Sequence, residues 1–270
     1  MLLHPRFEPG AWFDAVAEWR PTTTLLVPAV MRALVEHPRW PQADLSSLKF
    51  VNSGSQILPR HLIDAFHARG VPVAQVYGCT ESGPVSIVLR PDEALAHAGH
   101  SGRPALGVQV KLAADGEVLL KAANLMRGYH REAESAFDAD GWFHTGDLAR
   151  LHDDGCYELV GRSKELIISG GENIHPAEIE NLASAWPGVA EAAVVGLGDE
   201  RWGEVPVLVI VPQPGATVDL DALRASFDGH LARYKHPRRI VLRADLPRTA
   251  LGKVQRPALQ ALLQDDPAGP

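Results

Sequence analysis

The first 84 residues alternate between strand-like and helix-like segments, and this alternation most limits the folds available to the chain. Apolar and β-branched residues run from Thr22 to Val27, from Leu48 to Ser53 and from Val71 to Tyr77. Between these runs, apolar residues recur at the spacing of one helix face. Strands separated by helices pair in parallel through right-handed crossovers. The pattern therefore predicts a parallel α/β subdomain over residues 1–84.

The next part of the chain, residues 85–163, has a different pattern. Short alternating runs are separated by turn pairs such as Asp115-Gly116 and Asp154-Gly155. Such spacing is typical of a small antiparallel β-barrel or sheet. We take residues 1–163 as one large domain made of these two subdomains.

Residues 164–270 are predicted to form a smaller α+β domain. Pro176 can occupy the first turn of one helix, and Asp219 can cap another. Two valine-rich runs between these helices indicate paired strands. The predicted fold class is therefore α/β followed by α+β.

Composition narrows the classes of partner. The formal net charge is −7, and Lys and Arg are scattered, so no basic stripe indicates nucleic acid as a partner. The longest apolar stretch, Leu25 to Val35, is broken by Pro28 and Arg32 and is too short for a membrane span. Two cysteines do not make a disulfide framework, which favours a cytoplasmic location.

Several familiar catalytic and metal-binding patterns are missing from the sequence. It contains neither a Gly-x-Ser-x-Gly elbow nor a Gly-x-Gly-x-x-Gly loop, which argues against hydrolase and nicotinamide chemistry. None of the twelve histidines stands with Cys or Asp at a zinc-site spacing, so zinc is not predicted.

Two motifs follow strand-like runs in the first domain. In Tyr77 to Glu81, the aromatic ring can stack on a purine, the Thr80 hydroxyl can reach a phosphate oxygen and Glu81 can hold Mg²⁺. In Trp142 to Asp147, the carboxylate can accept both hydroxyls of a ribose. An ordinary strand-to-loop turn would explain the first string equally well, and an Asp that caps a tight turn is the simpler interpretation of the second.

Two further motifs lie in the second part of the chain. The run from Gly161 to Glu180 joins a charged link, a buried strand, a glycine-rich loop and a helix start. The run from Pro247 to Arg256 places Lys253 beside a glycine on a turn, where a lysine could reach a developing phosphoryl charge. A domain linker and a solvated surface lysine are the simpler interpretations.

These four motifs in this order resemble the adenylate-forming (AMP-binding) superfamily, and the match corresponds to the C-terminal part of an acyl-CoA or aryl-CoA synthetase. The resemblance implies an ATP-dependent, AMP-forming acid–CoA ligase. A fatty or aryl carboxylic acid, ATP and CoA would give acyl-CoA, AMP and pyrophosphate through an acyl-adenylate. ATP/AMP, Mg²⁺ and coenzyme A are the implied cofactors.

For the nucleotide, the resemblance implies that Gly54 and Ser55 border the adenine pocket and that Tyr77 stacks on the base. Thr80 would touch the α-phosphate, and Glu81 would hold Mg²⁺. In the motif from Tyr77 to Glu81, Gly78 would let the ligand approach the backbone closely. Three residues at this strand end are the candidates to line the acyl pocket: Val76, Gly78 and Cys79.

The resemblance also assigns roles around the domain boundary and beyond it. Asp147 would bind the ribose hydroxyls with Arg162 nearby, Lys164 would be the hinge of a small mobile domain, and Lys253 would be the adenylation lysine. Three residues would contact coenzyme A, two along the pantetheine and one on the nucleotide: Gly170, Gly171 and Trp202.

The sequence departs from the family at one important place. The Ser/Thr/Gly-rich loop that grips the β- and γ-phosphates is absent, as is the first large subdomain. We expect either a truncated enzyme or one that relies on a separate chain carrying that subdomain. A non-catalytic remnant acting as a binding module is the alternative, and transfer to a carrier protein instead of CoA is a third interpretation.

Overall fold

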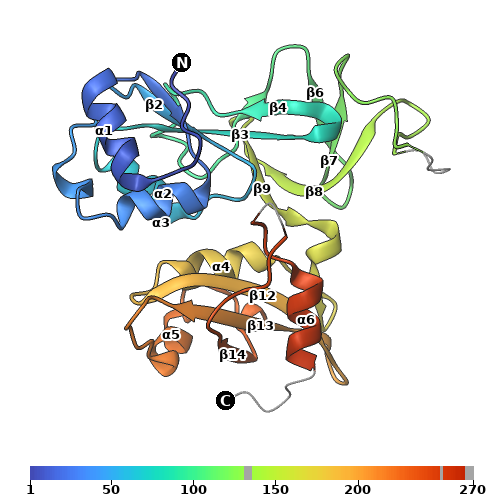
Figure 1. Cartoon of the computed structure of the whole chain (residues 1–270). Coiled ribbons are helices and arrows are strands. Elements are labelled where there is room, and N and C mark those ends of the chain that lie inside the picture. Colours follow the sequence, from blue (N-terminus) through green and yellow to red (C-terminus); the bar gives the residue numbers. More distant parts are fainter. Residues whose placement is uncertain (131–135, 250–251, 265–270) are drawn as a thin grey trace. The chain divides into compact units, whose positions relative to one another are not determined.

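The computed structural model describes residues 1–130, 136–249 and 252–264. The chain forms two compact units, Met1–Leu159 and Val160–Pro270 (Figure 1). The division falls inside strand β9 (Tyr157–Arg162), a few residues before the predicted boundary at 163/164. The predicted fold class is confirmed, with an α/β layer and an antiparallel sheet in the first unit and an α+β arrangement in the second.

A five-stranded sheet organises the start of the first unit, in the order β1-β2-β3-β4-β5. Its first three strands are parallel, as the alternating pattern predicts. Its last two strands are antiparallel additions. The strands are β1 (Thr23–Leu25), β2 (Phe50–Ser53), β3 (Val73–Cys79), β4 (Gly83–Val88) and β5 (Arg103–Pro104).

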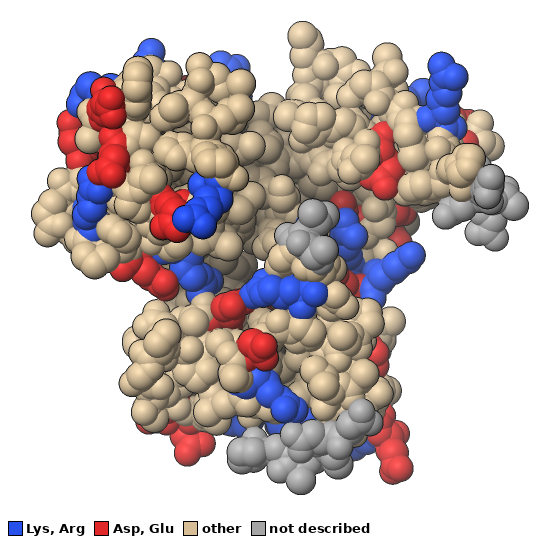
Figure 2. All heavy atoms as spheres, in the orientation of Figure 1, with Lys and Arg blue, Asp and Glu red and all other residues tan. Residues whose placement is uncertain are grey.

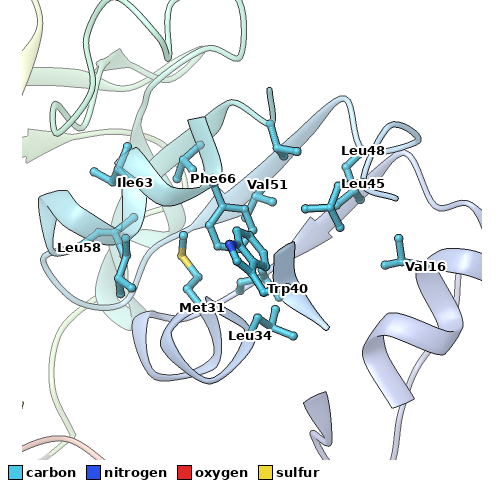
Figure 3. Packing of buried hydrophobic residues seen from close by; sticks show 14 of the residues in the cluster. Val16, Met31, Leu34, Trp40, Leu45, Leu48, Val51, Leu58, Ile63 and Phe66 are labelled. Carbon is cyan, nitrogen blue, oxygen red and sulfur yellow. The ribbon is translucent and has the colours of Figure 1, made fainter. Parts of the chain in front are cut away.

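Three helices and a short 3₁₀ turn supply the apolar residues that pack with this sheet. Met31, Leu34 and Val51 are fully buried together, and Trp40 packs on Phe66 with ring centroids 4.7 Å apart (Figure 3). Met31, Leu34 and Phe66 come from predicted helical faces, whereas Val51 belongs to β2 and Trp40 to a 3₁₀ turn. The helical elements are α1 (Pro9–Trp19), α2 (Pro28–Val35), η1 (Trp40–Gln42) and α3 (Arg60–His67).

The rest of the first unit is a four-stranded antiparallel sheet, β6-β7-β8-β9. Its strands are β6 (Gln109–Leu112), β7 (Glu117–Lys121), β8 (Phe143–Leu151) and β9. The predicted subdomain division at 84/85 differs from the structure, since it cuts through β4, which pairs with β3 in the first sheet. Ile87 of β4 packs against Val118 and Phe143 of the second sheet, so one strand serves two layers.

The second unit is built on a long hairpin of β12 (Val189–Asp199) and β13 (Gly203–Pro212). Val194 and Leu208 point to a core formed with α4 (Pro176–Ser184) and α5 (Leu220–Ser226). The alternate residues point to a second core with α6 (Arg256–Gln264). Because both faces are covered, the two strands are almost continuously apolar.

The remaining strands extend this sheet on either side of β13. Strands β10 (Ile167–Ser169) and β11 (Glu172–Ile174) form a small hairpin, and β14 (Arg239–Leu242) pairs in parallel with β13. Asp219 caps α5 by accepting hydrogen bonds from two backbone N–H groups, as predicted. Lys and Arg side chains lie beside Asp and Glu on the face of each unit shown in Figure 2. No helix in the described ranges has the length and hydropathy that a membrane crossing requires.

The first unit should lose stability as the pH falls, because of His67. Its Nε2 accepts a hydrogen bond of 3.1 Å from the Val73 backbone N–H, and burial lowers the pKa of the imidazole. In the unfolded chain the same group has a pKa of about 6.5 and binds a proton first. The free energy of unfolding should therefore fall as the pH drops through about 6.5, and level off below the folded pKa.

Urea unfolding between about pH 5 and 8 measures this dependence. His67→Gln should flatten the slope, whereas His4→Gln, at an exposed position, should not. Equal slopes in the wild type and His67→Gln would contradict the assignment.

Candidate functional site

The ends of β2 and β3 lie side by side, as the parallel pairing requires. Ser53 is aligned with Gln75, so the residues that follow β2 reach the second half of β3. A Cβ atom on Gly54 would lie 2.7 Å from the Val76 carbonyl oxygen, which is closer than packing allows. Ser55 follows in a left-handed conformation, with φ of 73°. Gly54 is thus required by the approach of this loop to β3.

Gly78 of β3 must also lack a side chain, because β4 approaches it closely. A Cβ atom there would lie 2.7 Å from the Gly83 carbonyl oxygen and from backbone atoms of Pro84. The chain turns back between β3 and β4 through the 3₁₀ turn η2 (Thr80–Ser82). The Cys79 N–H donates to the Ser82 hydroxyl at 3.2 Å, which holds this turn. Both glycines therefore have a packing reason beside their predicted role.

Tyr77 and Asp147, two predicted site residues 70 positions apart, are in direct contact. The Tyr77 hydroxyl donates to Asp147 Oδ2 at 2.9 Å, and Asp147 is only 7% exposed. Burial, and then the charge of Asp147, raises the pKa of Tyr77 far above its usual range. Tyr77 is consequently a neutral donor beside an acidic acceptor.

Local bonds fix the backbone around Asp147. The Gly146 N–H donates to Glu117 at 2.7 Å, and the Asp147 N–H donates to the Thr145 hydroxyl at 3.1 Å. The Thr145 hydroxyl in turn donates to the Val118 carbonyl at 2.8 Å. Gly146 has a φ of 69°, which suits glycine. These bonds join β8 to β7 and hold the carboxylate in place.

The next predicted pair, Thr80 and Glu81, lies on η2 and is joined to a later segment. Glu81 Oε1 accepts from the Tyr129 hydroxyl at 2.9 Å, and the Glu81 carbonyl accepts from the Met126 N–H at 2.7 Å. Asn124 donates to the Ser82 carbonyl at 2.7 Å. A single carboxylate of this kind can hold Mg²⁺, which usually keeps waters and phosphates as its other ligands. Sequence reasoning missed Tyr129 and Asn124, since neither belongs to a recognised string.

In the second unit, Gly170 and Gly171 form the two-residue turn between β10 and β11. Their φ values of 60° and 87° are both positive, as the tightest hairpin turns require. The Gly170 N–H donates to the Trp202 carbonyl at 2.7 Å. A Cβ atom on Gly170 would lie 2.7 Å from Trp202 Cε3, so the ring rests against the turn.

Two arginines flank the same indole. The guanidinium carbons of Arg201 and Arg238 lie 5.0 Å and 5.5 Å from its centroid. Asp199 accepts hydrogen bonds of 2.9 Å from the Arg201 and Trp202 N–H groups, which fixes this loop. The three predicted residues Gly170, Gly171 and Trp202 are thus brought together beside two cations for which no role was predicted.

Arg162 ends β9, and the predicted hinge residue Lys164 is exposed in the 3₁₀ turn η3 (Ser163–Glu165). The last residue of this turn, Glu165, pairs with Arg256 at 2.9 Å. Arg256 also donates to Glu180 of α4 at 2.6 Å and to the Val194 carbonyl of β12 at 2.8 Å.

Arg256 is the charged centre of this region. Burial opposes its charge, but Glu180 and Glu165 outweigh that effect and raise the pKa of the guanidinium. The network therefore joins the η3 turn, a helix and the central hairpin around one partly buried cation. Arg256 belongs to a quoted motif, yet nothing in the string shows which acidic residues it meets.

Lys253 lies on an exposed turn near the base of α6. The Thr249 N–H donates to the Lys253 carbonyl at 2.8 Å, and Arg248 bridges to Val254 in antiparallel fashion. Gly252 has a φ of 81°. Residues 250 and 251 of the predicted motif lie outside the described residues. Arg256, three positions later, anchors this hairpin to the body of the unit.

Solved structures with this fold are adenylate-forming enzymes. The chain is similar to o-succinylbenzoate CoA synthetase from Bacillus subtilis in complex with an acyl-adenylate, with 32% identity and a TM-score of 0.85 over 96% of this chain and 55% of that one. It is also similar to ATP-bound MatB from Rhodopseudomonas palustris, with 32% identity and a TM-score of 0.88 over 98% of this chain and 55% of that one.

Sequence comparisons agree with the fold. The profile described as AMP-binding enzyme matches residues 1–130, and the profile described as AMP-binding enzyme C-terminal domain matches residues 178–253. The chain is 46% identical to indoleacetate–CoA ligase from Aromatoleum aromaticum over 97% of its own length, and 40% identical to feruloyl-CoA synthase from an Amycolatopsis species over 94%. It spans 54% of the length of each. The chain belongs to the family of AMP-binding enzymes.

The two glycines of the β10–β11 turn should differ in their tolerance of a methyl group. Gly171→Ala should lower the free energy of unfolding by about 1–2 kcal/mol, the usual cost of a left-handed non-glycine residue. Gly170→Ala should lower it by about 1–3 kcal/mol more, because its Cβ atom also meets Trp202. Denaturant unfolding of both variants tests this order, which equal losses would contradict.

Proposed function

We propose that this chain supplies the adenylate- and CoA-binding parts of an acid–CoA ligase. In that reaction a carboxylate attacks the α-phosphate of ATP and expels pyrophosphate, and the thiol of coenzyme A then displaces AMP from the acyl-adenylate. The observation that carries the proposal is the hydrogen-bonded pair of half-buried Tyr77, near the end of β3, and buried Asp147, in the middle of β8. The relatives named as CoA ligases support the same reaction.

The chemistry of this pair suits a nucleoside. In the proposed complex, the Asp147 carboxylate accepts the two ribose hydroxyls, and charge-assisted bonds of this kind are stronger than neutral ones. Tyr77 stays protonated, donates to Asp147 and presents its ring to the adenine. Gly54 and Ser55 provide a side-chain-poor wall for the base, and Gly78 lets the ligand approach the β3 backbone.

Thr80 and Glu81 would serve the phosphates. The Thr80 hydroxyl is assigned to the α-phosphate, and the Glu81 carboxylate to Mg²⁺. When bound, the metal ion supplies a positive charge that offsets the charge of the phosphate oxygens. Tyr129 donates to the Glu81 carboxylate and thereby orients it.

Lys253 is the proposed adenylation lysine, and Arg162 and Lys164 are assigned to the ribose and the hinge. A cation placed at the α-phosphate is most useful where charge develops in the transition state. Arg256 has a positioning role, because it fixes the base of the Lys253 hairpin to Glu180 and joins it to the hinge turn through Glu165. Movement of the hinge turn is thereby coupled to the lysine hairpin.

The turn of Gly170 and Gly171 with the Trp202 ring is the proposed coenzyme A contact. A glycine turn leaves room for the thin pantetheine chain, and the indole offers a flat surface for the CoA base. Arg201 and Arg238 beside the ring supply positive charge for the CoA phosphates. These cations favour CoA over a carrier protein as acceptor.

We infer an aromatic carboxylic acid as the substrate class. The two relatives quoted by sequence are named for indoleacetate and for the feruloyl group, both aromatic. Residues at the end of β3 would form one wall of the acid pocket, and they are partly apolar: Val76, Gly78 and Cys79. The rest of the pocket would come from the family's first subdomain.

A further segment, in the same or a separate chain, is the proposed partner of the first unit. β1 is an edge strand of the first sheet. Leu25 of β1 is 71% exposed, Val27 beside it is 39% exposed and Trp19 at the end of α1 is 64% exposed. Exposed apolar side chains next to an unpaired edge are typical of a surface that another segment covers. The segment carrying the phosphate-gripping loop is the occupant we propose.

Asp147→Asn should weaken binding of an acyl-adenylate mimic by roughly 10- to 100-fold, because hydrogen bonds to a charged acceptor are worth about 1.5–3 kcal/mol. Calorimetric titration with an aroyl sulfamoyl-adenosine measures this loss. Asp92→Asn, which removes an exposed carboxylate paired with Arg90, is the matched control and should bind normally. Absence of binding to the wild type would refute the proposed site.

Lys253→Ala should suppress adenylation far more than thioester formation from supplied acyl-adenylate, with a barrier increase of roughly 3–4 kcal/mol. ATP–pyrophosphate exchange and CoA thioester formation, measured with the loop-carrying segment supplied, give the two rates. Lys49→Ala, an exposed lysine of the first unit, is the control. Aromatic acids should support exchange better than long-chain fatty acids. Equal loss in both half-reactions would exclude the assigned role, and no exchange with any acid would favour the non-catalytic binding module.

A further inference from the structure

A cluster of metal-ligating side chains lies in the first unit, apart from the proposed nucleotide site. His97, His100 and Cys156 each offer a ligand atom, and these atoms all lie within 4.8 Å of one another. No zinc-site spacing is visible in the sequence, because the histidines and the cysteine come from segments more than fifty residues apart. The fold brings them together where the 91–100 segment meets the β8–β9 turn.

Backbone bonds hold the two segments in register. The Ser101 N–H donates to the Tyr157 carbonyl at 2.8 Å, and the Tyr157 N–H donates to the Gly102 carbonyl at 2.7 Å. Arg103 pairs with Glu93 at 2.6 Å and donates to the Asp154 carbonyl at 3.1 Å. The cluster is thus built on a fixed frame, which a metal site requires.

Local contacts and burial define the surroundings of each member of the trio. The Asp154 carboxylate lies 3.1 Å from His97 Nδ1 and leaves Nε2 for a metal, an arrangement common around zinc-bound histidines. His100 Nδ1 is buried, and it has no hydrogen-bond partner among the described residues. Cys156 is fully buried, and Asp154 accepts from its N–H at 2.9 Å. An unpaired buried imidazole nitrogen is costly, and a metal ion would satisfy it.

The donor set selects the kind of ion. Two imidazole nitrogens and one thiolate sulfur suit zinc and similar transition metals, whereas Mg²⁺ and Ca²⁺ prefer oxygen. Ligand atoms of a tetrahedral zinc site lie roughly 3.3–3.8 Å apart, given bond lengths of about 2.0–2.3 Å. The side chains would therefore close up by about 1 Å on binding, a shift that rotamer changes can supply.

A neighbouring trio shares His100 but fits less well. His100, His152 and Glu158 also lie within 4.8 Å of one another. However, His152 Nε2 already pairs with Glu158 at 3.0 Å, and the His152 ring stacks on His100 with centroids 4.2 Å apart. Glu158 holds the His152 ring, and that ring orients His100 by stacking on it.

We propose that His97, His100 and Cys156 bind one divalent transition-metal ion of the zinc type, which fastens the 91–100 segment to the β8–β9 turn. Three protein ligands leave the fourth position of a tetrahedral ion for water. The site is separate from the Mg²⁺ assigned to Glu81, and it does not depend on the proposed ligase reaction.

The test uses the purified chain after removal of metal with a chelator. Titration with Co²⁺ should produce the near-ultraviolet band of a thiolate–cobalt bond at one ion per chain, and Zn²⁺ should abolish it by competition. Native mass spectrometry should find one Zn²⁺ per chain. Absence of both signals in the wild type would overturn the proposal.

Variants identify the ligands. Cys156→Ser should lose the thiolate band, whereas Cys79→Ser, at the other cysteine, should keep it. His97→Asn and His100→Asn should weaken Zn²⁺ binding by at least about tenfold. His97 is only partly buried, so its variant keeps the test valid if Cys156→Ser fails to fold. Glu158→Gln should bind Zn²⁺ normally. A loss in Glu158→Gln combined with normal binding in Cys156→Ser would overturn the assigned set of ligands.

Discussion

The double pairing of strand β3 is the constraint on which the proposed nucleotide site depends. Its first half pairs in parallel with β2, and its second half pairs antiparallel with β4. The parallel half brings the loop after β2 to Val76, and the antiparallel half forces the tight return at Gly78. Between these two constraints Tyr77 is held where its hydroxyl meets Asp147 from the second sheet. One strand thereby collects residues from three distant parts of the sequence.

The second unit depends on a different feature, a partly buried cation, Arg256, with two acidic partners. Removing one member of such a set is expensive, because the remaining charges are left in a poorly solvated place. Here Arg256 holds together the η3 turn, which carries the proposed hinge residue, the helix α4 and the turn that carries Lys253. The arrangement fixes the segment next to Lys253, as the adenylation role proposed for that lysine requires.

Much of the fold could be predicted from the sequence, because it rests on periodicity and turn chemistry. The alternation over residues 1–84 predicted the parallel strands, and Asp219 predicted the start of α5. The role of β4 could not be predicted, since a strand with apolar residues on both faces does not reveal which sheet it joins. Motif strings identified Tyr77 and Asp147 but not their mutual bond, because 70 residues separate them. The acidic partners of Arg256 and the contact of Tyr129 with Glu81 were hidden for the same reason.

The close approach of Gly170 to the Trp202 ring makes the residues allowed at one position depend on the residue at the other. The Trp202 ring occupies the space that a Cβ atom at position 170 would need. This steric requirement for glycine holds only while the ring is present. A version of the chain with a small residue at position 202 would be released from that steric condition and could accept asparagine, which tolerates the left-handed backbone, at position 170. Substitutions at the two positions should therefore be correlated among related sequences, and a redesign of the proposed CoA contact must change them together.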